Sequence, residues 1–294
     1  MSAVAVRVRT YLRLGRVSNL PTVWTNVVAG AVLAGGSAAP RTLVPLCLAL
    51  SLFYVAGMFL NDAFDRRFDA RARPDRPIPA GEIGAAEVFG WGYAMLGTGV
   101  LILLAQAYAP GGPGTPWPAV SGLVLAGAIV LYDVWHKANP ASPLLMGTCR
   151  FLVYATAALA AGGRLSTELL AGAAMLLSYV AGLTYAAKQE DLGHVRRWWP
   201  LALVGAPFVY AAPAVAASVA GAALYAVFLA CVAYATSLLR RGGASIGRAV
   251  AFYIAGISLL DGLLLARARI DGAALLGAGG LFMTLFFQRY VRGT

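Results

Sequence analysis

The chain has 294 residues, of which 60% are hydrophobic and only 12% are charged, and its mean hydropathy is +0.73. A soluble domain carries about twice that fraction of charged residues, so the composition excludes an ordinary soluble protein. The net charge of +11 does not indicate a nucleic-acid partner, because no RNA- or DNA-binding motif accompanies it and basic residues gather in the cytoplasmic loops of membrane proteins.

Long apolar stretches predict an all-α fold, a polytopic membrane helix bundle. Backbone groups in lipid must be satisfied within the chain, which leaves helices or a closed barrel, and unbroken apolar runs favour helices. At about 20 residues per span, the chain holds nine or ten spans. The ten candidate segments are approximately 19–36, 42–60, 84–108, 118–134, 143–162, 166–187, 199–217, 220–239, 247–266 and 271–288.

The distribution of basic residues predicts the orientation of these spans. With the N-terminus in the cytoplasm, 19 of the 23 Lys and Arg residues fall on the cytoplasmic side, as is typical of a multi-pass protein of the bacterial inner membrane. We expect residues 1–18 to be a cytoplasmic N-terminal segment and residues 19–294 to be one transmembrane domain. The first apolar run is interpreted as a retained span, because no small-residue cleavage site follows it. Ten spans fit the charges slightly better than nine.

An ordered set of polar residues follows the second apolar segment: Asn61, Asp62, Asp65 and Asp69. If the helix continues, Asn61, Asp65 and Asp69 lie one turn apart on one face, with Asp62 beside them. Such carboxylates repel one another unless a cation lies between them, and their hard oxygens suit Mg²⁺. The guanidinium groups of the neighbouring arginines have a donor geometry that matches phosphate oxygens. Carboxylates for a metal and arginines for phosphate together predict a site for a lipid-like diphosphate. The alternative is a solvated loop with surface salt bridges. These arginines are Arg66, Arg67, Arg71, Arg73 and Arg76.

The pattern Asn-Asp-x-x-Asp-x-x-x-Asp that begins at Asn61, followed by Arg-Pro-x-Pro-x-Gly from Arg76, resembles the first signature of the UbiA superfamily of intramembrane prenyltransferases. The resemblance implies helices, usually nine spans, around a central cavity, with Mg²⁺ bridging the diphosphate of a prenyl donor to two acidic loops. It implies that Asn61, Asp62, Asp65 and Asp69 bind the metal and that Asp65 and Asp69 are catalytic. Arg66 and Arg76 are expected to bind the substrate.

The second signature of the family, usually two aspartates after the sixth span, is altered here. In the corresponding stretch the only carboxylates are Glu190 and Asp191, and adjacent side chains on a helix point about 100° apart. We expect Asp191 to be the remaining catalytic and metal-binding residue, with Glu190 assisting. Lys188 can contact phosphate as a point charge. His194 is either a surface residue or a ligand or base.

Polar residues near other spans complete the predicted site. Tyr132 and Lys137 match, by type and position, family residues that hold the diphosphate, and Asp133 either positions Lys137 or contacts the acceptor. Arg150 lies within an apolar segment, which is costly unless it is paired or faces a cavity, so it is a candidate substrate-binding residue. The alternative for Arg150 is snorkelling to the interface.

The start of the first span, residues 16–26, also resembles the family. The resemblance adds Arg16 and Asn26 to the residues that are expected to bind the substrate. Asn26 either lines the cavity or hydrogen-bonds a neighbouring helix. A rival motif begins at Asp261 and resembles the CDP-alcohol phosphotransferase signature. Its spacing is one residue too long and its later aspartates are absent, so we interpret it as a coincidence.

These observations predict Mg²⁺-dependent transfer of a prenyl group from a prenyl diphosphate to an acceptor within the membrane. The acceptor is either a small molecule, such as an electron-rich aromatic ring, or a lipid. The alternative function is a non-catalytic isoprenoid- or lipid-binding carrier on the same fold, which the altered second loop suggests. The acceptor itself and the length of the prenyl chain do not follow from the sequence.

Overall fold

The computed structural model describes residues 3–137, 139–188, 198–291 and 293. Within these residues every regular element is a helix, which confirms the predicted all-α fold. The elements are α1 (Ala3–Leu14), the 3₁₀ turn η1 (Val17–Asn19), α2 (Leu20–Leu33), α3 (Pro40–Ala72), α4 (Ala85–Tyr108), α5 (Trp117–Trp135), α6 (Ser142–Ala160), α7 (Thr167–Ala187), α8 (Pro200–Ala211), α9 (Pro213–Ala217), α10 (Val219–Arg241), α11 (Ser245–Arg267), α12 (Asp271–Ala274) and α13 (Leu276–Phe287).

Local sequence signals set many of the helix boundaries. Proline occupies the first or second position of α2, α3, α5, α6, α8 and α9, where its missing N–H is not needed for helix hydrogen bonds. Ser166 and Ser218 cap α7 and α10, because their hydroxyl oxygens accept from Leu169 N at 3.2 Å and from Gly221 N at 3.0 Å.

Each predicted apolar segment corresponds to helix in the structure, but the first and last are short. Eight helices in the described part of the chain, with α8 and α9 counted as one, are long and apolar enough to cross a membrane. The first segment forms α2, which has 14 residues, and the last is divided into α12 and α13. Fourteen helical residues rise about 21 Å, less than the roughly 30 Å of a hydrocarbon core. These two segments therefore lie in the bundle as partial-length helices.

The short helices pack around α11, which is the most buried of the long helices. Small residues allow α11 and α13 to approach closely. A Cβ atom added at Gly262 would lie 2.6 Å from the Ala274 carbonyl oxygen, and one added at Gly277 would lie 2.6 Å from the Ser258 carbonyl oxygen. Backbones that approach this closely are typical of helix packing in membranes. The last segment is therefore fixed to the bundle by contact with α11.

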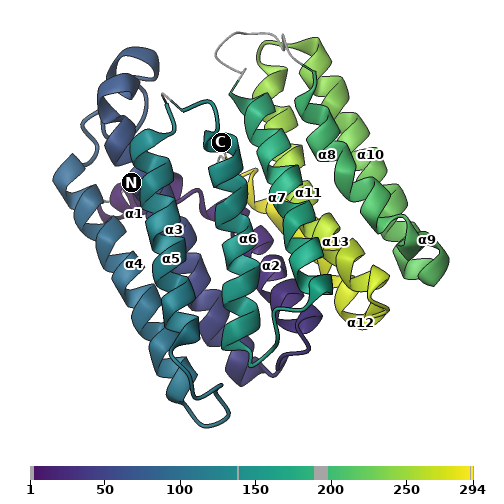
Figure 1. The fold of residues 1–294 in the computed structure, drawn as a ribbon. Coiled ribbons are helices and arrows are strands. Elements are labelled where there is room, and N and C mark those ends of the chain that lie inside the picture. Colours follow the sequence, from purple (N-terminus) through teal and green to yellow (C-terminus); the bar gives the residue numbers. More distant parts are fainter. Residues whose placement is uncertain (1–2, 138, 189–197, 292, 294) are drawn as a thin grey trace.

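The helices form two groups that meet where α6 packs against α7, and α2 contacts both groups (Figure 1). In one group α3, α4, α5 and α6 are consecutive neighbours, and in the other α7, α8, α10 and α11 lie together. The C-terminal ends of α3, α5 and α7 and the N-terminal end of α6 all lie at the same end of the bundle. The polar residues that the sequence singles out therefore converge at this end.

Candidate active site

The acidic residues that follow the second apolar segment lie on the last turns of α3, whose 33 residues extend about 50 Å, beyond a hydrocarbon core. The helix continues to Ala72, as the four-residue spacing requires. The side chains of Asp62, Asp65 and Asp69 are only 7%, 6% and 1% exposed. Carboxylates buried to this extent do not form a solvated surface loop, so that alternative does not describe this segment.

Arg76 covers this acidic face from the loop that follows α3. Ala80 N donates to the Arg76 carbonyl oxygen at 2.9 Å, and Gly81, with a φ of 74°, adopts a backbone conformation that favours glycine. The folded loop places Arg76 Nη1 3.1 Å from Asp62 Oδ1 and 2.7 Å from Asp69 Oδ2. Burial lowers the pKa of Arg76, but the carboxylates of Asp62 and Asp69 outweigh it and hold this pKa above its usual value.

Arg16 brings a second guanidinium group to Asp62 from the turn between α1 and η1. Its backbone is left-handed, with a φ of 42°, which is uncommon for a residue other than glycine. Arg16 Nη2 lies 3.2 Å from Asp62 Oδ1. The preceding helix α1 is fixed to the same loop, because Arg13 Nη1 donates to Glu82 Oε1 at 2.9 Å. The expected division of the chain at residue 18 stays a prediction.

The C-terminal end of α5 supplies cationic and aromatic groups opposite Asp65. Lys137 Nζ and His136 Nε2 lie 3.1 Å and 3.3 Å from Asp65 Oδ2. The Tyr132 ring stacks on the His136 ring, with centroids 4.9 Å apart, and Lys137 Nζ lies 3.9 Å from the centroid of the Phe68 ring. The structure thus brings α3 and α5 together through Asp65.

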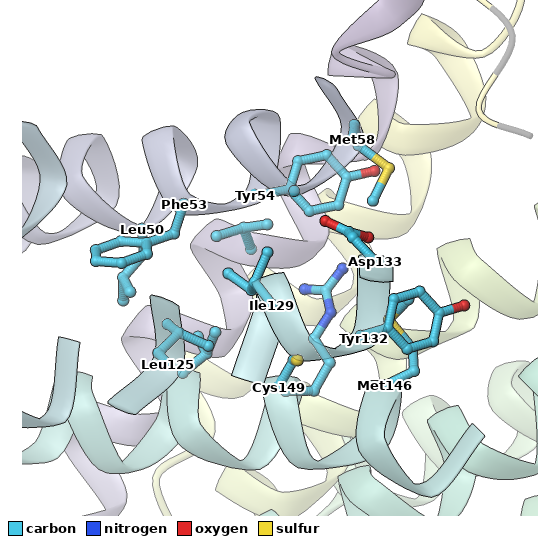
Figure 2. Close-up of a pocket in the computed structure, with 14 residues that line it drawn as sticks. Leu50, Phe53, Tyr54, Met58, Leu125, Ile129, Tyr132, Asp133, Met146 and Cys149 are labelled. Atoms are coloured by element: carbon cyan, nitrogen blue, oxygen red, sulfur yellow. The ribbon is translucent and has the colours of Figure 1, made fainter. Parts of the chain in front are cut away.

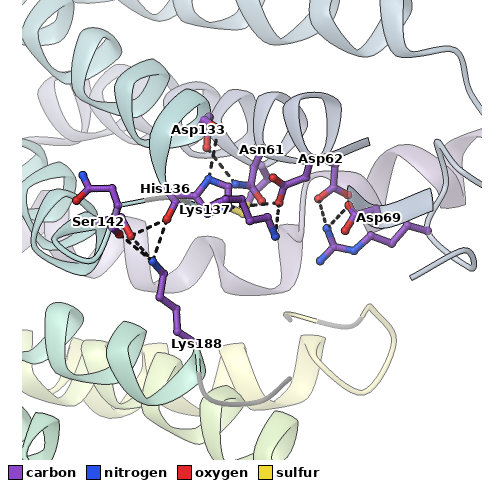
Figure 3. Close-up of polar contacts among 12 residues, drawn as sticks. Asn61, Asp62, Asp69, Asp133, His136, Lys137, Ser142 and Lys188 are labelled. Carbon is purple, nitrogen blue, oxygen red and sulfur yellow. Dashed lines mark hydrogen bonds and ion pairs between the residues drawn. The ribbon is translucent and has the colours of Figure 1, made fainter. Parts of the chain in front are cut away.

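Lys188, the residue that follows α7, connects the second helix group to the loop between α5 and α6 (Figure 3). Its Nζ donates to the carbonyl oxygens of His136 at 2.9 Å and Asn139 at 3.2 Å, and also to Ser142 Oγ. Burial, followed by the nearby charge of Lys137, lowers the pKa of Lys188. This ammonium group therefore adds a polar connection at the end of the bundle to the direct packing of α6 against α7.

A chain of polar groups runs deeper in the bundle and joins α6, α2 and α11. Arg150 Nη1 donates to Asn26 Oδ1 at 2.7 Å, and Asn26 Nδ2 donates to both carboxylate oxygens of Asp261, at 2.9 and 2.7 Å. Tyr154 donates to Asp261 Oδ1 at 2.6 Å, and Arg150 Nη2 donates to Thr22 Oγ1 at 3.2 Å. The buried cation and anion are thus connected through an amide, and Arg150 does not snorkel to the interface.

A cavity of about 500 Å³ lies beside these groups. Its polar lining includes Arg16, Asn61, Asp65, Arg73, Arg76, Tyr132, His136, Lys137, Arg150 and Lys188, and its apolar lining includes Val180, Leu183, Val250, Ile254 and Ile257. A smaller, mainly apolar crevice of about 80 Å³ lies between α3, α5 and α6 (Figure 2), and Val23 of α2 also contributes to its lining. The two spaces adjoin, because Tyr54, Met58, Tyr132, Met146 and Arg150 line both.

The structure does not bring every predicted residue into this cluster. Arg66 Nη1 donates to the Ala63 carbonyl oxygen at 2.8 Å, and its guanidinium lies 5.6 Å from the centroid of the Phe89 ring, outside the cavity lining. Glu190 and Asp191, expected to bind metal, and His194 lie outside the described residues.

Sequence reasoning missed two members of the site, His136 and Asp261. His136 lies four residues after Tyr132, a spacing that places both rings on one helical face and offers a local signal. The signal for Asp261 is a carboxylate within an apolar helix, which indicates a polar partner in membrane proteins. The interpretation of the Asp261 motif as a coincidence overlooked this environment, since the side chain is 1% exposed and bonded to Asn26.

The donor atoms on α3 fit a divalent ion that is shared with a substrate. Among the described residues, no group of three or more His, Cys, Asp or Glu side chains is close enough to bind a metal directly. The carboxylates of Asp62, Asp65 and Asp69 face cations instead. Mg²⁺ usually binds one or two carboxylates and completes its shell with phosphate oxygens and water, so this donor set suits it when a diphosphate is present.

Comparisons with known proteins agree on one family. Residues 22–239 match the model of the UbiA prenyltransferase family. Digeranylgeranylglyceryl phosphate synthase from Natronomonas pharaonis is 30% identical over 135 residues, which are 46% of this chain and 46% of the relative. The protein of the same name from Ignicoccus hospitalis is 35% identical over 99 residues, which are 34% of this chain and 32% of the relative. The matched stretch thus spans less than half the length of each relative.

Two solved structures share the fold. One is described as giving structural and mechanistic insights into the biosynthesis of digeranylgeranylglyceryl phosphate synthase in membranes. Its alignment has a TM-score of 0.57 and 18% identity, and it covers 90% of this chain and 99% of the chain in that structure. The other, the apo structure of a UbiA homologue from Aeropyrum pernix K1, has a TM-score of 0.51 and 19% identity, and covers 92% and 95%. At these identities the likeness concerns the fold alone.

Proposed function

The chain belongs to the UbiA prenyltransferase family, and on this basis we propose that it transfers a prenyl group from a prenyl diphosphate to an acceptor within the membrane. One observation carries the proposal. A cavity of about 500 Å³ is lined by the buried carboxylate of Asp65, by several cations, two of which pair with Asp62 and Asp69 on the same helix, and by apolar side chains of α7 and α11. A ligand with an anionic head and an apolar chain matches this division. The carboxylates are Asp62, Asp65 and Asp69, and the cations are Arg16, Arg76, Lys137 and Lys188.

We assign Mg²⁺ to Asp65 and Asp69, with Asn61 and Asp62 beside them, because these are hard oxygen donors on one helical face. When bound there, the ion neutralises charge on the leaving diphosphate and acts as a Lewis acid. Glu190 and Asp191 stay predicted ligands from the second loop. Arg66 is not part of this proposal, since its guanidinium faces Phe89.

Basic side chains that face carboxylates in this structure are the proposed diphosphate ligands. Arg76, Arg16 and Lys137 each donate to an α3 carboxylate at 2.7 to 3.2 Å. A diphosphate offers these donors alternative oxygens, which frees the carboxylates for the ion. Lys188 lines the cavity nearby and adds a further ammonium donor.

The remaining walls suit the chemistry of prenyl transfer. Cleavage of the C–O bond leaves its electron pair on the diphosphate and an allylic cation on the prenyl group. The acceptor then bonds to the cation and loses a proton, which the released diphosphate can take up. Tyr54 and Tyr132 line the cavity, and their ring faces are sites that stabilise a cation. Apolar side chains such as Leu183 and Ile257 exclude water, which would otherwise capture the cation.

Substrate and membrane orientation are part of the proposal. The acceptor is either a small molecule or a lipid, and the names of the relatives favour neither for this chain by themselves. We place the polar end of the bundle and the N-terminus at the cytoplasmic face of the cell membrane, because 19 of the 23 basic residues fall on that side when the predicted spans alternate.

A second candidate function is a carrier that binds an isoprenoid or related lipid without turnover. The altered second loop favours it, because Glu190 and Asp191 are adjacent rather than spaced along a helical face. On this hypothesis the diphosphate binds at the α3 carboxylates and stays intact.

The test uses the purified chain in lipid nanodiscs with Mg²⁺, either farnesyl or geranylgeranyl diphosphate, and an acceptor from each proposed class, a panel of phenols or a membrane lipid extract. It measures binding, diphosphate release and prenylated product. The enzyme hypothesis predicts release that Asp65→Asn and Asp69→Asn each reduce at least about 100-fold, a typical loss when electrostatic stabilisation of a transition state is removed. Asp75→Asn is the matched control, because Asp75 lies in the same region but is exposed, and it should behave as the unaltered protein. Tight binding without release supports the carrier, and unaltered binding by both variants would remove α3 from the site.

A further inference from the structure

Asp133 is a buried carboxylate that is only half satisfied. Its side chain, near the C-terminal end of α5, is 4% exposed. Asp133 Oδ1 accepts a hydrogen bond from Asn61 Nδ2 at 3.2 Å, whereas Oδ2 is buried and has no hydrogen-bond partner among the described residues. A buried oxygen without a partner costs free energy, so this atom marks a position that a ligand or a water can satisfy.

The carboxylate lies at the edge of the 80 Å³ crevice (Figure 2). Figure 2 shows it close to Tyr54 and Met58 of the facing helix α3, while the interior of the crevice is formed by apolar side chains. The interior residues are Leu50, Phe53, Leu125, Ile129 and Val153. An apolar pocket with a few convergent polar groups is the usual form of a small-molecule site.

Arg150 adds hydrogen-bond donors to the same space. A guanidinium carries five N–H donors, and the side-chain hydrogen bonds of Arg150 to Asn26 and Thr22 occupy two of them. The remaining donors have no acceptor within the described part of the chain, and the residue lines both the crevice and the large cavity. Since Asp261 already balances its charge through Asn26, Arg150 does not require an anionic ligand.

We propose that the crevice binds a small, mainly apolar molecule of about one ring in size, which donates a hydroxyl group to Asp133 Oδ2 and accepts from Arg150. The size follows from the volume. A cavity of about 150 Å³ holds benzene, so a ring in a crevice of 80 Å³ extends partly into the adjoining cavity. A whole prenyl chain is too large for this crevice. If the chain transfers prenyl groups as proposed, this ligand is the acceptor. Only that identification rests on the proposed function, and the binding itself does not.

Binding is tested with 4-fluorophenol and 4-fluoroanisole as probes, by ¹⁹F NMR line broadening on the full chain in nanodiscs without Mg²⁺ or prenyl diphosphate. Both probes contain a fluorinated ring and an oxygen, but only the phenol can donate a hydrogen bond. We expect saturable binding of the phenol, stronger than that of the anisole by about fivefold, as one additional hydrogen bond of ordinary net strength provides.

Asp133→Asn is the informative variant. Its amide oxygen can keep the bond from Asn61, which turns the NH₂ group toward the crevice and replaces an acceptor by a donor. We expect the preference for the phenol to disappear. Val153→Phe, which fills the crevice, should abolish binding of both probes, and the exposed control Asp75→Asn should change neither.

Three results would overturn the inference: equal binding of the two probes by the unaltered chain, an undiminished preference in Asp133→Asn, or no saturable binding, which would mean that water alone fills the crevice. Because no prenyl diphosphate is present, these results leave the proposed function untouched. Conversely, a chain that binds the phenol but never releases diphosphate would retain this site and lose the proposed function.

Discussion

Replacement of Asn26 by leucine tests whether the buried polar chain stabilises the bundle. The amide oxygen of Asn26 accepts from Arg150 at 2.7 Å, and its nitrogen donates to both oxygens of Asp261. Leucine has a similar size but no polar atoms. The substitution therefore separates a buried guanidinium from a buried carboxylate without opening a large cavity.

Two independent arguments give the expected magnitude. Hydrogen bonds between membrane helices contribute about 0.6 kcal/mol on average and up to about 1.7 kcal/mol, so the three bonds of Asn26 contribute roughly 2 to 5 kcal/mol. A buried polar group that loses its partner costs about 1 to 3 kcal/mol, and more when the group is charged. Both arguments include a cost of about 3 kcal/mol, and at about 2 to 4 °C per kcal/mol for large domains we expect Tm to fall by roughly 6 to 12 °C.

The assay is thermal unfolding in detergent micelles, followed with a thiol-reactive dye. The three cysteines, Cys47, Cys149 and Cys231, are free, and Cys149 is buried in the bundle near the polar chain, so unfolding exposes new thiols. Thr156→Val is the matched control. Thr156 Oγ1 is buried without a partner in the described structure, so its removal should leave Tm unchanged or raise it slightly.

A double-variant cycle separates the polar chain from simple repacking. If the cost comes from stranding the Asp261 carboxylate, Asn26→Leu combined with Asp261→Leu should be less destabilising than the sum of the single changes by about 1 kcal/mol or more. A fall in Tm of less than about 2 °C for Asn26→Leu, equal to that of Thr156→Val, would refute the reasoning. So would strict additivity in the cycle.

Three further predictions concern the polar end. Arg76→Gln removes the cation nearest Asp69, so we expect affinity for inorganic pyrophosphate with Mg²⁺, measured by calorimetry, to fall at least about tenfold; unchanged affinity would contradict the assigned role. Lys188→Met removes three donated bonds, and spin labels on α5 and α7 should report a wider distance distribution between the two helix groups; identical distributions would disprove the connection. Hydrogen bonds from Thr10 and Arg13 lower the pKa of Glu82, although burial opposes them. Docking of α1 should therefore be favoured above the pKa of an unfolded glutamate, about 4.3, and should weaken as the pH falls below that value. A spin label on α1 should become mobile on acidification in the unaltered chain. Glu82→Gln should show a smaller effect of pH, and the part that persists belongs to Glu87 of α4, which accepts from Arg7 and Tyr11 of α1.

The acidic face of the site could be predicted because it depends only on local periodicity. Asn61, Asp65 and Asp69 are four residues apart, and a helix that continues past the apolar segment must place them on one side. The positions of the apolar segments likewise follow from hydropathy, but their number as full-length spans does not, because two of the ten predicted segments are short helices. The close approach of α2 to α6, where a Cβ atom added at Gly30 would lie 2.8 Å from the Tyr154 carbonyl oxygen, is also a property of the packed bundle.

The partners of these carboxylates could be predicted by type but not by pairing. The sequence indicates that Arg16, Lys137 and Lys188 are basic and lie near the same membrane face. It does not indicate that Lys137 pairs with Asp65, or that Lys188 donates to backbone carbonyls of another helix group. Such pairings depend on the distances between helices, which local sequence does not fix.

The sequence by itself determined the fold class, the membrane setting and the acidic helical face, because hydrophobicity and helical spacing are properties of neighbouring residues. Only the tertiary structure joined Asn26 to Asp261, which lie 235 residues apart, and left one oxygen of Asp133 without a partner beside a crevice. A polar residue inside a membrane requires a partner, but which residue becomes that partner is decided when the helices pack.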